Sequence, residues 1–376
     1  MLTSKLPHVG TTIFTTMSAL AQEHGAINLA QGFPNFPIDP LLEQHLLSAA
    51  TQNVHQYAPM QGLPALREEI ASLIFRQYDR EISSQEILVT AGATQAIFTI
   101  IQALVFSGEE VIILDPSYDC YEAPVLLSGA RPIRLPLTDT FDPDWALIEN
   151  SISDHTKLLI VNNPHNPSGK VWCAADFEAL ERIMQRFPKL LLLSDEVYEF
   201  ISFTGTHQSI HQRSAIRERS IVVSSFGKTF HVTGWKIGYL VCPAPIMQEI
   251  LKVHQFLVFC VNSLMQHALA NYLREVDVNE LKSFYQQKRD LFRQGLAKSR
   301  FELLPAEGSY FQVVSFKGIS DLSDVDFCRE LTIQHGVAAI PLSVFNADGK
   351  DEQLIRFCFA KTDETLHAAI DKLCKI

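Results

Sequence analysis

One lysine stands just past a short apolar run that predicts a strand at 221–223. Gly227, next to this Lys228, allows the backbone to approach a ligand closely. Ser225 and Lys236 flank the lysine with groups that can hold an anion. An amine in such a place suits a covalent anchor, although an isolated lysine is most often a solvated surface charge. Its role therefore depends on matching residues elsewhere in the chain.

An acid follows another predicted strand. Asp195 comes two residues after the end of the apolar run 190–193, and Tyr198 follows three residues later. An ionised carboxylate at the end of a buried strand is costly unless a cation meets it. A pyridinium nitrogen would be such a cation, and a protonated ring accepts the electrons released when a bond to a substrate α-carbon breaks. A salt bridge or a helix cap is the competing interpretation of this acid.

The segment Thr90-Ala-Gly-Ala-Thr94 joins a predicted strand to a predicted helix. Its small residues leave backbone N–H groups free to face an anion at the helix N-terminus, which favours a phosphate site. The segment matches neither a P-loop nor a dinucleotide-binding fingerprint. A plain turn with Thr94 as the cap is the alternative interpretation.

Three further residues could contribute to the same site. Asn166 lies in the proline-rich loop 162–169, which could present its amide to a ring oxygen. Tyr118 follows a predicted strand, where its ring could stack on a flat ligand or pack in the core. Arg356 alternates with the apolar residues of 355–359, so the pleat points its guanidinium away from the core side. Its planar fork suits a carboxylate, with a surface salt bridge as the alternative.

The composition argues against several functions. The 376 residues contain 31 Lys and Arg against 42 Asp and Glu, a net charge of −11, so a basic surface for nucleic acid or an anionic membrane is not expected. The N-terminus lacks an apolar signal core, and no apolar run approaches the roughly 20 residues of a membrane span, so we expect a cytoplasmic protein. The seven cysteines lack metal-ligand spacing, so we expect no metal site.

The elements that must position these residues follow the order of an α/β protein. Apolar runs predict strands at 86–90, 111–114, 158–161, 190–193, 221–223 and 239–241. Helical stripes of apolar residues at 97–105 and 177–184 lie between them. This alternation predicts a mostly parallel sheet covered by helices, with ligands beyond the carboxyl ends of the strands.

The alternation of apolar strands and helices ends at about residue 280, where a charged helical stretch begins. Strands at 308–314 and 355–359 and helices at 324–335 and from Thr362 follow. We therefore expect three parts, which are an N-terminal arm with part of a small domain at 1–40, a large domain at 41–280 and the small C-terminal domain at 281–376.

Taken together, these motifs resemble the class I aminotransferases of pyridoxal phosphate fold type I, over almost the whole chain. The segments 28–37, 56–59, 227–236 and 340–345 resemble the branch of methionine aminotransferases and kynurenine/glutamine transaminases. The resemblance implies an α/β fold, with a mostly parallel seven-stranded sheet in the large domain and a smaller α+β domain. It also implies a homodimer.

The resemblance implies that Lys228 is linked covalently to pyridoxal 5'-phosphate and later moves the proton at the substrate α-carbon. Asp195 would pair with the ring nitrogen. The other implied cofactor contacts are Asn166 and Tyr198 at the phenolic oxygen, Tyr118 on the ring, and Ala93, Thr94, Ser225, Lys236 and the other subunit's Tyr57 at the phosphate. Many members of the wider superfamily have arginine where this chain has Lys236, and we interpret the lysine as typical of this branch.

The substrate contacts are also implied by the resemblance. Gly32, Asn166 and Arg356 would receive the substrate carboxylate, and Phe14, Phe33 and Phe345 would form an apolar pocket that favours methionine and aromatic amino acids over aspartate.

The implied reaction is ping-pong transfer of the amino group of an L-amino acid to a 2-oxo acid. Methionine and aromatic amino acids are the expected donors, with glutamine and kynurenine as further candidates. One alternative is a carbon–sulfur β-lyase that uses the same cofactor on the same fold. Another is a non-catalytic, cofactor-sensing regulator, but the roughly 16 residues before Met17 are too few for a DNA-binding module.

Overall fold

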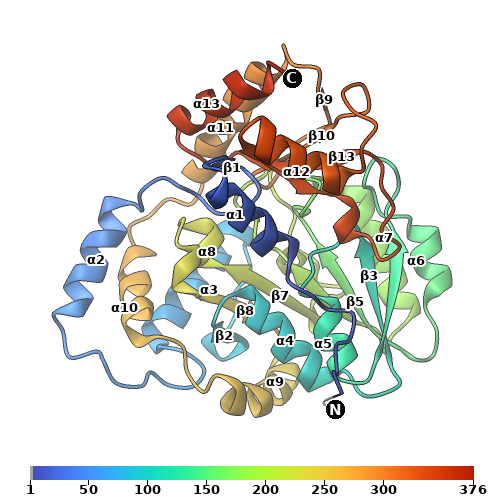
Figure 1. Ribbon diagram of the computed structural model, residues 1–376. Helices are drawn as coiled ribbons and strands as arrows, with labels where there is room; N and C mark the ends of the chain where they lie inside the picture. Colours follow the sequence, from blue (N-terminus) through green and yellow to red (C-terminus); the bar gives the residue numbers. More distant parts are fainter. Residues whose placement is uncertain (1–2) are drawn as a thin grey trace.

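The computed structural model describes residues 3–376, so Met1 and Leu2 of the expected N-terminal arm lie outside the described residues. Its centre is a seven-stranded sheet in the order β2-β8-β7-β6-β5-β3-β4 (Figure 1). The strands are β2 (Ile87–Thr90), β3 (Glu110–Asp115), β4 (Arg131–Pro136), β5 (Thr156–Asn162), β6 (Leu191–Asp195), β7 (Ser220–Ser225) and β8 (Gly238–Val241). Strand β8 runs antiparallel to both of its neighbours, and every other pair in this sheet is parallel. The expected mostly parallel sheet is confirmed.

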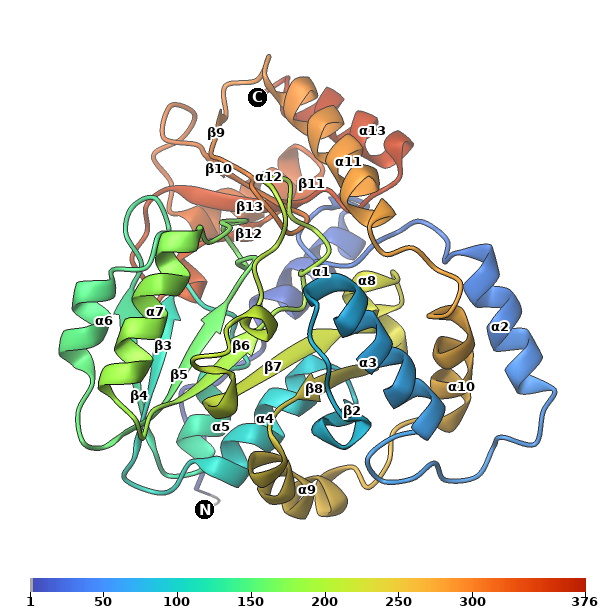
Figure 2. The same cartoon turned by 180° about the vertical axis from the view of Figure 1, so that it is seen from behind.

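Helices cover both faces of this sheet, which gives three layers (Figures 1 and 2). Helices α4, α5 and α9 pack on one face, while α3, α10, α6 and α7 pack on the other. The bounds are α2 (Pro40–Ala50), α3 (Pro64–Tyr78), α4 (Ala93–Leu104), α5 (Glu122–Leu127), α6 (Trp145–Ser151), α7 (Ala174–Arg186), α8 (Phe226–Thr229), α9 (Ala244–Leu257) and α10 (Ser263–Tyr272). The strands are apolar on both faces because both faces are covered.

Local sequence accounts for several helix boundaries. Helix α4 follows Gly92, which adopts φ 79° at the N-cap, a backbone conformation that favours glycine. The stripe predicted at 177–184 lies inside α7 and is buried. Short 3-10 helices connect other elements at η1 (Ser84–Glu86), η2 (Ile210–Gln212), η3 (Arg217–Arg219), η4 (Thr233–Trp235) and η5 (Ser343–Phe345).

Strand β4 is the one strand of the large sheet that the apolar pattern did not predict. It pairs with β3 in parallel at the edge of the sheet, and most of its residues are partly or fully exposed. Pro132 and Pro136 remove two backbone donors, which is tolerated where no further strand needs them. Half-exposed and interrupted by proline, this segment lacks the continuous apolar run of the buried strands.

A second group of elements lies above the large sheet in Figure 1. It has a four-stranded antiparallel sheet, β12-β13-β10-β9, and a parallel pair, β1 with β11. The bounds are β1 (Ile27–Asn28), β9 (Glu302–Leu303), β10 (Phe311–Ser315), β11 (Val337–Ala338), β12 (Ile340–Pro341), β13 (Leu354–Cys358), α1 (Ile13–Glu23), α11 (Glu280–Leu296), α12 (Asp324–Gln334) and α13 (Asp363–Leu373). The predicted C-terminal helices and strands are found, although the strand expected at 308–314 begins only at Phe311.

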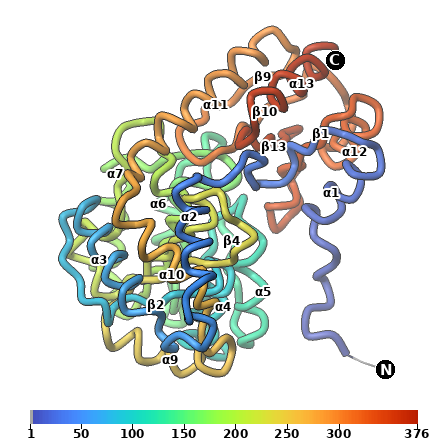
Figure 3. The backbone as a smooth tube through the Cα atoms, turned by 90° about the vertical axis from the view of Figure 1, so that its left-hand side faces the viewer, coloured from blue at the N-terminus to red at the C-terminus, as the bar shows by residue number. Residues whose placement is uncertain are grey.

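The N-terminal part of the chain packs with this second group. Met17 and Ala21 of α1 are buried in the same apolar core as residues of β10 and β13. Residues 3–12, which precede α1, extend away from these elements and are largely exposed (Figure 3). No helix within residues 3–376 has the length and apolar character needed to cross a lipid bilayer.

The carboxyl ends of β5, β6 and β7 meet at one edge of the large sheet. Asn162 at the end of β5 pairs with Asp195 at the end of β6, which in turn pairs with Val223 of β7. The second group of elements lies over this edge, so residues that follow these strands can meet residues of β13.

Candidate active site

A cavity of about 460 Å³ lies at this edge, between the large sheet and the second group of elements. Its lining brings together most of the residues that the sequence singles out. These are Phe14, Gly32, Phe33, Ala93, Thr94, Tyr118, Asn166, Asp195, Tyr198, Ser225, Lys228, Lys236 and Arg356. They come from segments more than 300 positions apart, so only the folded chain assembles them.

Two of the expected residues do not line the cavity. Phe345 is buried behind it, with its ring centre 5.9 Å from that of Phe14 and 5.5 Å from the guanidinium carbon of Arg356. Tyr57 is 82% exposed and packs edge-on against Phe259 at 5.3 Å. Phe345 thus supports the pocket wall from outside, in place of the direct contact that we expected.

Lys228 lies in α8, directly after β7, as the sequence predicts. Its Nζ donates a hydrogen bond to the backbone oxygen of Gly32 at 3.3 Å. The same oxygen accepts a 2.8 Å bond from the hydroxyl of Tyr310. Burial lowers the pKa of Lys228 to about 8, and the positive charges of Arg356 and Lys236 act in the same direction. A lysine with this pKa is partly neutral near neutral pH, as a nucleophilic amine must be.

Asp195 ends β6 and is only 4% exposed. Its Oδ2 accepts a 2.7 Å hydrogen bond from the hydroxyl of Tyr121, and its Oδ1 accepts one from the backbone N–H of Val197 at 3.3 Å. Burial raises the pKa of this carboxyl to about 6, and these hydrogen bonds offset part of the effect. Residues 3–376 place no ion-pair partner on it within 4 Å, so the acid retains capacity for a cationic ligand.

The sequence did not single out Tyr121 as a partner of Asp195. In the sequence it stands three residues after Tyr118, with no local pattern that links it to Asp195. The hydrogen bond spans 74 positions and depends on the tertiary packing that brings Tyr121, at the N-cap of α5, to the end of β6, which local patterns do not encode. A buried tyrosine hydroxyl needs a partner, and that requirement is the physical signal that points to such a contact.

Arg356 on β13 is 1% exposed and lines the cavity. Its Nη1 donates to Oδ1 of Asn166 at 2.7 Å, and its Nη2 donates to the backbone oxygen of Ala30 at 3.1 Å. Its guanidinium carbon lies 3.9 Å from the ring centre of Phe311, and burial lowers its pKa. The Nε of Arg356 is buried without a hydrogen-bond partner among the described residues. The alternative of a surface salt bridge is therefore wrong, because the side chain is enclosed between the two groups of elements.

Ala93, Thr94, Ser225 and Lys236 lie together at another part of the cavity. Helix α4 has 12 residues and begins at Ala93, so its first N–H groups have no partners within the helix. A side-chain carbon added at Gly92 would lie 3.6 Å from Nζ of Lys236, which places the ammonium against the start of this helix. A helix N-terminus, a hydroxyl and an ammonium are together suited to bind an anion, and we refer to these four residues as the anion site.

The donor set fits pyridoxal phosphate. The anion site suits its phosphate, and Asp195, which has no ion-pair partner among the described residues, suits its pyridinium nitrogen. The amine of Lys228, whose pKa is lowered, suits its aldehyde. Arg356 lines the same cavity, and no carboxylate within residues 3–376 forms an ion pair with it, so its charge is available to a carboxylate ligand.

Comparison with known proteins agrees with this fit. The family model Aminotransferase class I and II matches residues 24–373. Methionine aminotransferase of Escherichia coli (strain K12) is 50% identical over 375 residues, which cover 98% of this chain and 97% of the relative. Kynurenine–oxoglutarate transaminase 3 of Mus musculus is 34% identical over 403 residues, which cover 97% of this chain and 88% of the relative.

A solved structure gives the same result. The crystal structure of YbdL from Escherichia coli, described as having a methionine aminotransferase function, superposes with a TM-score of 0.97 at 50% identity and covers 100% of both chains. These relatives carry aminotransferase names, so the β-lyase alternative gains no support from them. The family match over nearly the whole length confirms the expected resemblance, and the chain belongs to the class I and II aminotransferases as a pyridoxal-phosphate-dependent transaminase.

Proposed function

We propose that the cavity is the cofactor and substrate site of this transaminase. The observation that carries the proposal is that Lys228, Asp195 and Arg356 line one cavity although they come from three separate elements. In this proposal Lys228 is the covalent anchor, Asp195 pairs with the ring nitrogen, and Asn166 and Tyr198 hydrogen-bond the phenolic oxygen. The stacking contact on the ring is assigned to Tyr118.

The anion site of Ala93, Thr94, Ser225 and Lys236 is proposed to hold the cofactor phosphate. Arg356 would bind the substrate carboxylate. Its Nη1 bond to Asn166 fixes the plane of the guanidinium, and no carboxylate within residues 3–376 competes for its charge by forming an ion pair.

The bound cofactor supplies an electron sink for the carbanion that forms when the α-proton leaves. The chain's own residues supply the proton transfer. Lys228 Nζ can accept a proton because burial keeps its pKa near 8, and the same ammonium can then return the proton at another atom. Burial of Asp195 makes its negative charge costly unless it is opposite a positive charge, which favours a protonated ring nitrogen beside it.

We infer that the substrates are amino acids with uncharged side chains, above all methionine and aromatic amino acids. The lysines and arginines that line the cavity are Lys228, Lys236 and Arg356, each assigned above to another group. The carboxylate of Asp119 also lines the cavity, and it would repel an acidic substrate side chain. Phe14 and Phe33 add apolar surface, and the names of the two relatives support methionine and kynurenine as donors.

A homodimer is part of the proposal. Tyr57 lies outside the cavity of its own chain, beside an exposed apolar group formed by Phe256, Leu257 and Phe259. These three side chains are 86%, 46% and 47% exposed, as expected for a surface that a second copy covers. Tyr57 would then reach the phosphate of the second copy. We also propose the division into parts at 1–40, 41–280 and 281–376, and a cytoplasmic location.

An amino-donor screen with the purified protein and pyridoxal phosphate tests the function. Methionine, phenylalanine, tyrosine, glutamine and kynurenine are each mixed with a 2-oxo acid, and product formation is followed together with the visible spectrum of the cofactor. We expect conversion of methionine and an aromatic donor, and little conversion of aspartate. Failure of all five donors would contradict the substrate class. Release of pyruvate and ammonia from cystathionine without a 2-oxo acid would favour the β-lyase.

A further inference from the structure

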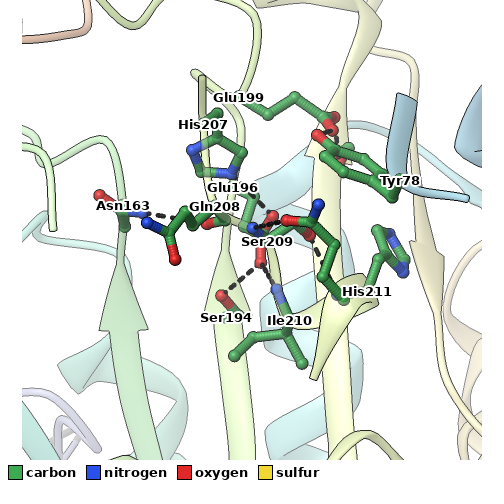
Figure 4. Close-up of polar contacts among 12 residues, drawn as sticks. Tyr78, Asn163, Ser194, Glu196, Glu199, His207, Gln208, Ser209, Ile210 and His211 are labelled. Carbon is green, nitrogen blue, oxygen red and sulfur yellow. Dashed lines mark hydrogen bonds and ion pairs between the residues drawn. The ribbon is translucent and has the colours of Figure 1, made fainter. Parts of the chain in front are cut away.

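A buried polar cluster surrounds Glu196 and Glu199 (Figure 4), which alternate along the chain with Asp195 and Tyr198. Asp195 and Tyr198 line the cavity, whereas Glu196 and Glu199 do not. These two glutamates are 1% and 4% exposed, so both carboxyl groups are inside the protein. The proposed function gives neither of them a role, and buried carboxyl groups are costly unless they are satisfied.

Glu199 is held by hydroxyl groups from three other elements. Its Oε1 accepts hydrogen bonds from Oγ of Ser224 on β7 at 2.7 Å and from the hydroxyl of Tyr239 on β8 at 3.4 Å. Its Oε2 bonds with the hydroxyl of Tyr78 at the end of α3 (Figure 4). Glu199 therefore links the segment after β6 to two neighbouring strands and to a covering helix.

Glu196 is held by a different set of groups. Its Oε2 pairs with Nε2 of His207 at 3.0 Å, and its Oε1 accepts bonds from Oγ of Ser194 at 2.9 Å and from the backbone N–H of Ile210 at 3.1 Å (Figure 4). Burial acts to raise the pKa of Glu196, but other effects, of which the hydrogen bond to the His207 imidazole is the largest, hold it below its usual value. Glu196 thus ties the loop at 207–210 to the end of β6.

The two carboxyl groups are electrostatically unequal. Burial raises the pKa of Glu199 to about 7, and the nearby charge of Glu196 acts in the same direction. The other titratable groups that face Glu199 are Tyr78, Tyr239 and His207, and none of them is a permanent cation. An apolar side chain of equal volume would avoid the free-energy cost of burying a carboxyl group. We therefore expect the hydrogen bonds of Glu199 to fix the relative positions of the segments that they join more than to stabilise the fold.

The residues that Glu199 joins are direct neighbours of residues that line the cavity. Ser224 precedes Ser225, which lines the anion site, and Lys228 follows in the next turn of chain. Tyr198 precedes Glu199 and lines the cavity from the other strand end. The hydrogen bond between Glu199 and Ser224 therefore joins the segment after β6 to the end of β7 on the side away from the cavity. The same two segments carry Tyr198 and Ser225, which line the cavity.

We propose that Glu199 is a positioning residue for transamination, holding Tyr198 and Ser225 at a fixed separation through its hydrogen bonds to Ser224 and Tyr78. The inference rests on the proposed function, because it assigns the cofactor to the cavity that these residues line. It assigns to Glu199 no contact with the cofactor or the substrate.

Two pairs of variants test the proposal. Ser224→Ala removes the hydroxyl that Glu199 holds, and Ser220→Ala removes an equally buried hydroxyl at the other end of β7, which bonds to the backbone oxygen of Ile216. Tyr78→Phe removes the second hydroxyl on Glu199, and Tyr285→Phe removes a buried hydroxyl that has no partner in the described part of the chain.

The readouts are the affinity of the cofactor-free protein for pyridoxal phosphate, kcat and KM for methionine, and the thermal midpoint without cofactor. We expect Ser224→Ala and Tyr78→Phe to lower cofactor affinity and kcat each by about fivefold to tenfold, with KM nearly unchanged. Ser220→Ala and Tyr285→Phe should leave cofactor affinity and kcat within about twofold of wild type, whatever their thermal midpoints. Glu199→Gln, which keeps the shape and an acceptor oxygen, should retain more cofactor affinity than Glu199→Leu.

Equal cofactor affinity and kcat in Ser224→Ala, Ser220→Ala and wild type would overturn the proposal, because the cluster would then be purely structural. Equal loss in Glu199→Gln and Glu199→Leu would also overturn it. A wild-type protein that binds no cofactor and transfers no amino group would contradict the proposed function instead, so the two failures are distinguishable.

Discussion

Arg356 and Asn166 lie 190 positions apart in the sequence, yet Nη1 of the arginine donates to Oδ1 of the amide at 2.7 Å. The bond joins β13 of the second sheet to the loop after β5 of the large sheet. The proposed carboxylate and cofactor contacts therefore depend on each other's position.

Arg356→Lys should raise KM for methionine and lower kcat/KM about a hundredfold. A lysine keeps the charge but loses the planar fork and the hydrogen bonds to Asn166 and the backbone of Ala30. Steady-state kinetics measure the change. The matched control is Arg329→Lys on α12, an exposed arginine whose kinetics should equal wild type. Equal kcat/KM in Arg356→Lys and wild type would remove Arg356 from the substrate site.

Lys228→Ala should lower turnover by more than about a thousandfold, because no other amine takes over both the covalent link and the proton transfer. Some cofactor binding should remain through the anion site and Asp195. Equilibrium dialysis with pyridoxal phosphate and a transamination assay measure the two effects separately. Lys252→Ala, an exposed lysine paired within α9, is the control. Substantial transamination by the Lys228 variant would refute its assignment as the anchor.

Glu199 should make the stability of the cofactor-free protein depend on pH. Its pKa in the folded chain is about 7, above its ordinary value of 4.5, so the folded state binds more protons between these values. The contribution is present below about pH 4.5 and is lost as the pH rises through about 7. Relative to Glu199→Gln, wild type should therefore lose up to about 3 kcal/mol of unfolding free energy between pH 5 and pH 8.

Urea unfolding of both proteins at several pH values measures this difference. The comparison cancels groups that the two proteins share, such as His211, whose pKa burial lowers to about 3. Parallel stability curves for wild type and Glu199→Gln would show that Glu199 does not titrate in this range.

Gly238→Ala should lower both stability and cofactor affinity. A side-chain carbon at this position of β8 would lie 2.5 Å from the backbone oxygen of Ser224 and 3.3 Å from the Cα atoms of Gly92 and Ser225. The strands must then move apart beside the anion site, at a cost of about 2 kcal/mol. Gly318→Ala is the control, because nothing lies within 4 Å of the added carbon. Urea unfolding measures the stability and cofactor titration measures the affinity. Both should be lower in Gly238→Ala than in Gly318→Ala.

Phe259→Ser should shift a dimer toward monomers and weaken cofactor binding in parallel. The substitution removes an exposed ring that also supports Tyr57. Sedimentation over a range of protein concentrations measures the association. Leu322→Ser, at a 38% exposed position before α12, should leave it unchanged. If wild type is monomeric at all concentrations and binds cofactor fully, the proposed contact of Tyr57 with the phosphate of a second copy is wrong.

Local sequence predicted the buried strands well because burial on both faces produces continuous apolar runs, as at 158–161 and 221–223. It missed β4, where edge position and two prolines remove that signal. The sequence predicted only part of the environment of the Arg356 side chain. The pleat correctly placed its side chain opposite Ile355 and Phe357, but only the packing of the two sheets shows that this side is an enclosed cavity.

The partners of the site residues were harder to predict than the residues themselves. Asp195 was identified from its place after a strand, whereas its hydrogen bond to Tyr121 depends on tertiary packing. Glu199 follows the identified Tyr198, yet its proposed role depends on hydroxyl groups of Tyr78 and Ser224 that only the fold brings near. Contacts of this kind join distant segments and leave no local periodicity.

The backbone oxygen of Gly32 receives hydrogen bonds from both Nζ of Lys228 and the hydroxyl of Tyr310. When the amine turns toward another group, the hydroxyl of Tyr310 still donates to this oxygen. Movement of the lysine therefore leaves the backbone oxygen of Gly32 with a hydrogen-bond partner. The amine that we propose to be catalytic can thus exchange partners at little cost, while Tyr310, the residue before β10, keeps its hydrogen bond to the backbone at Gly32.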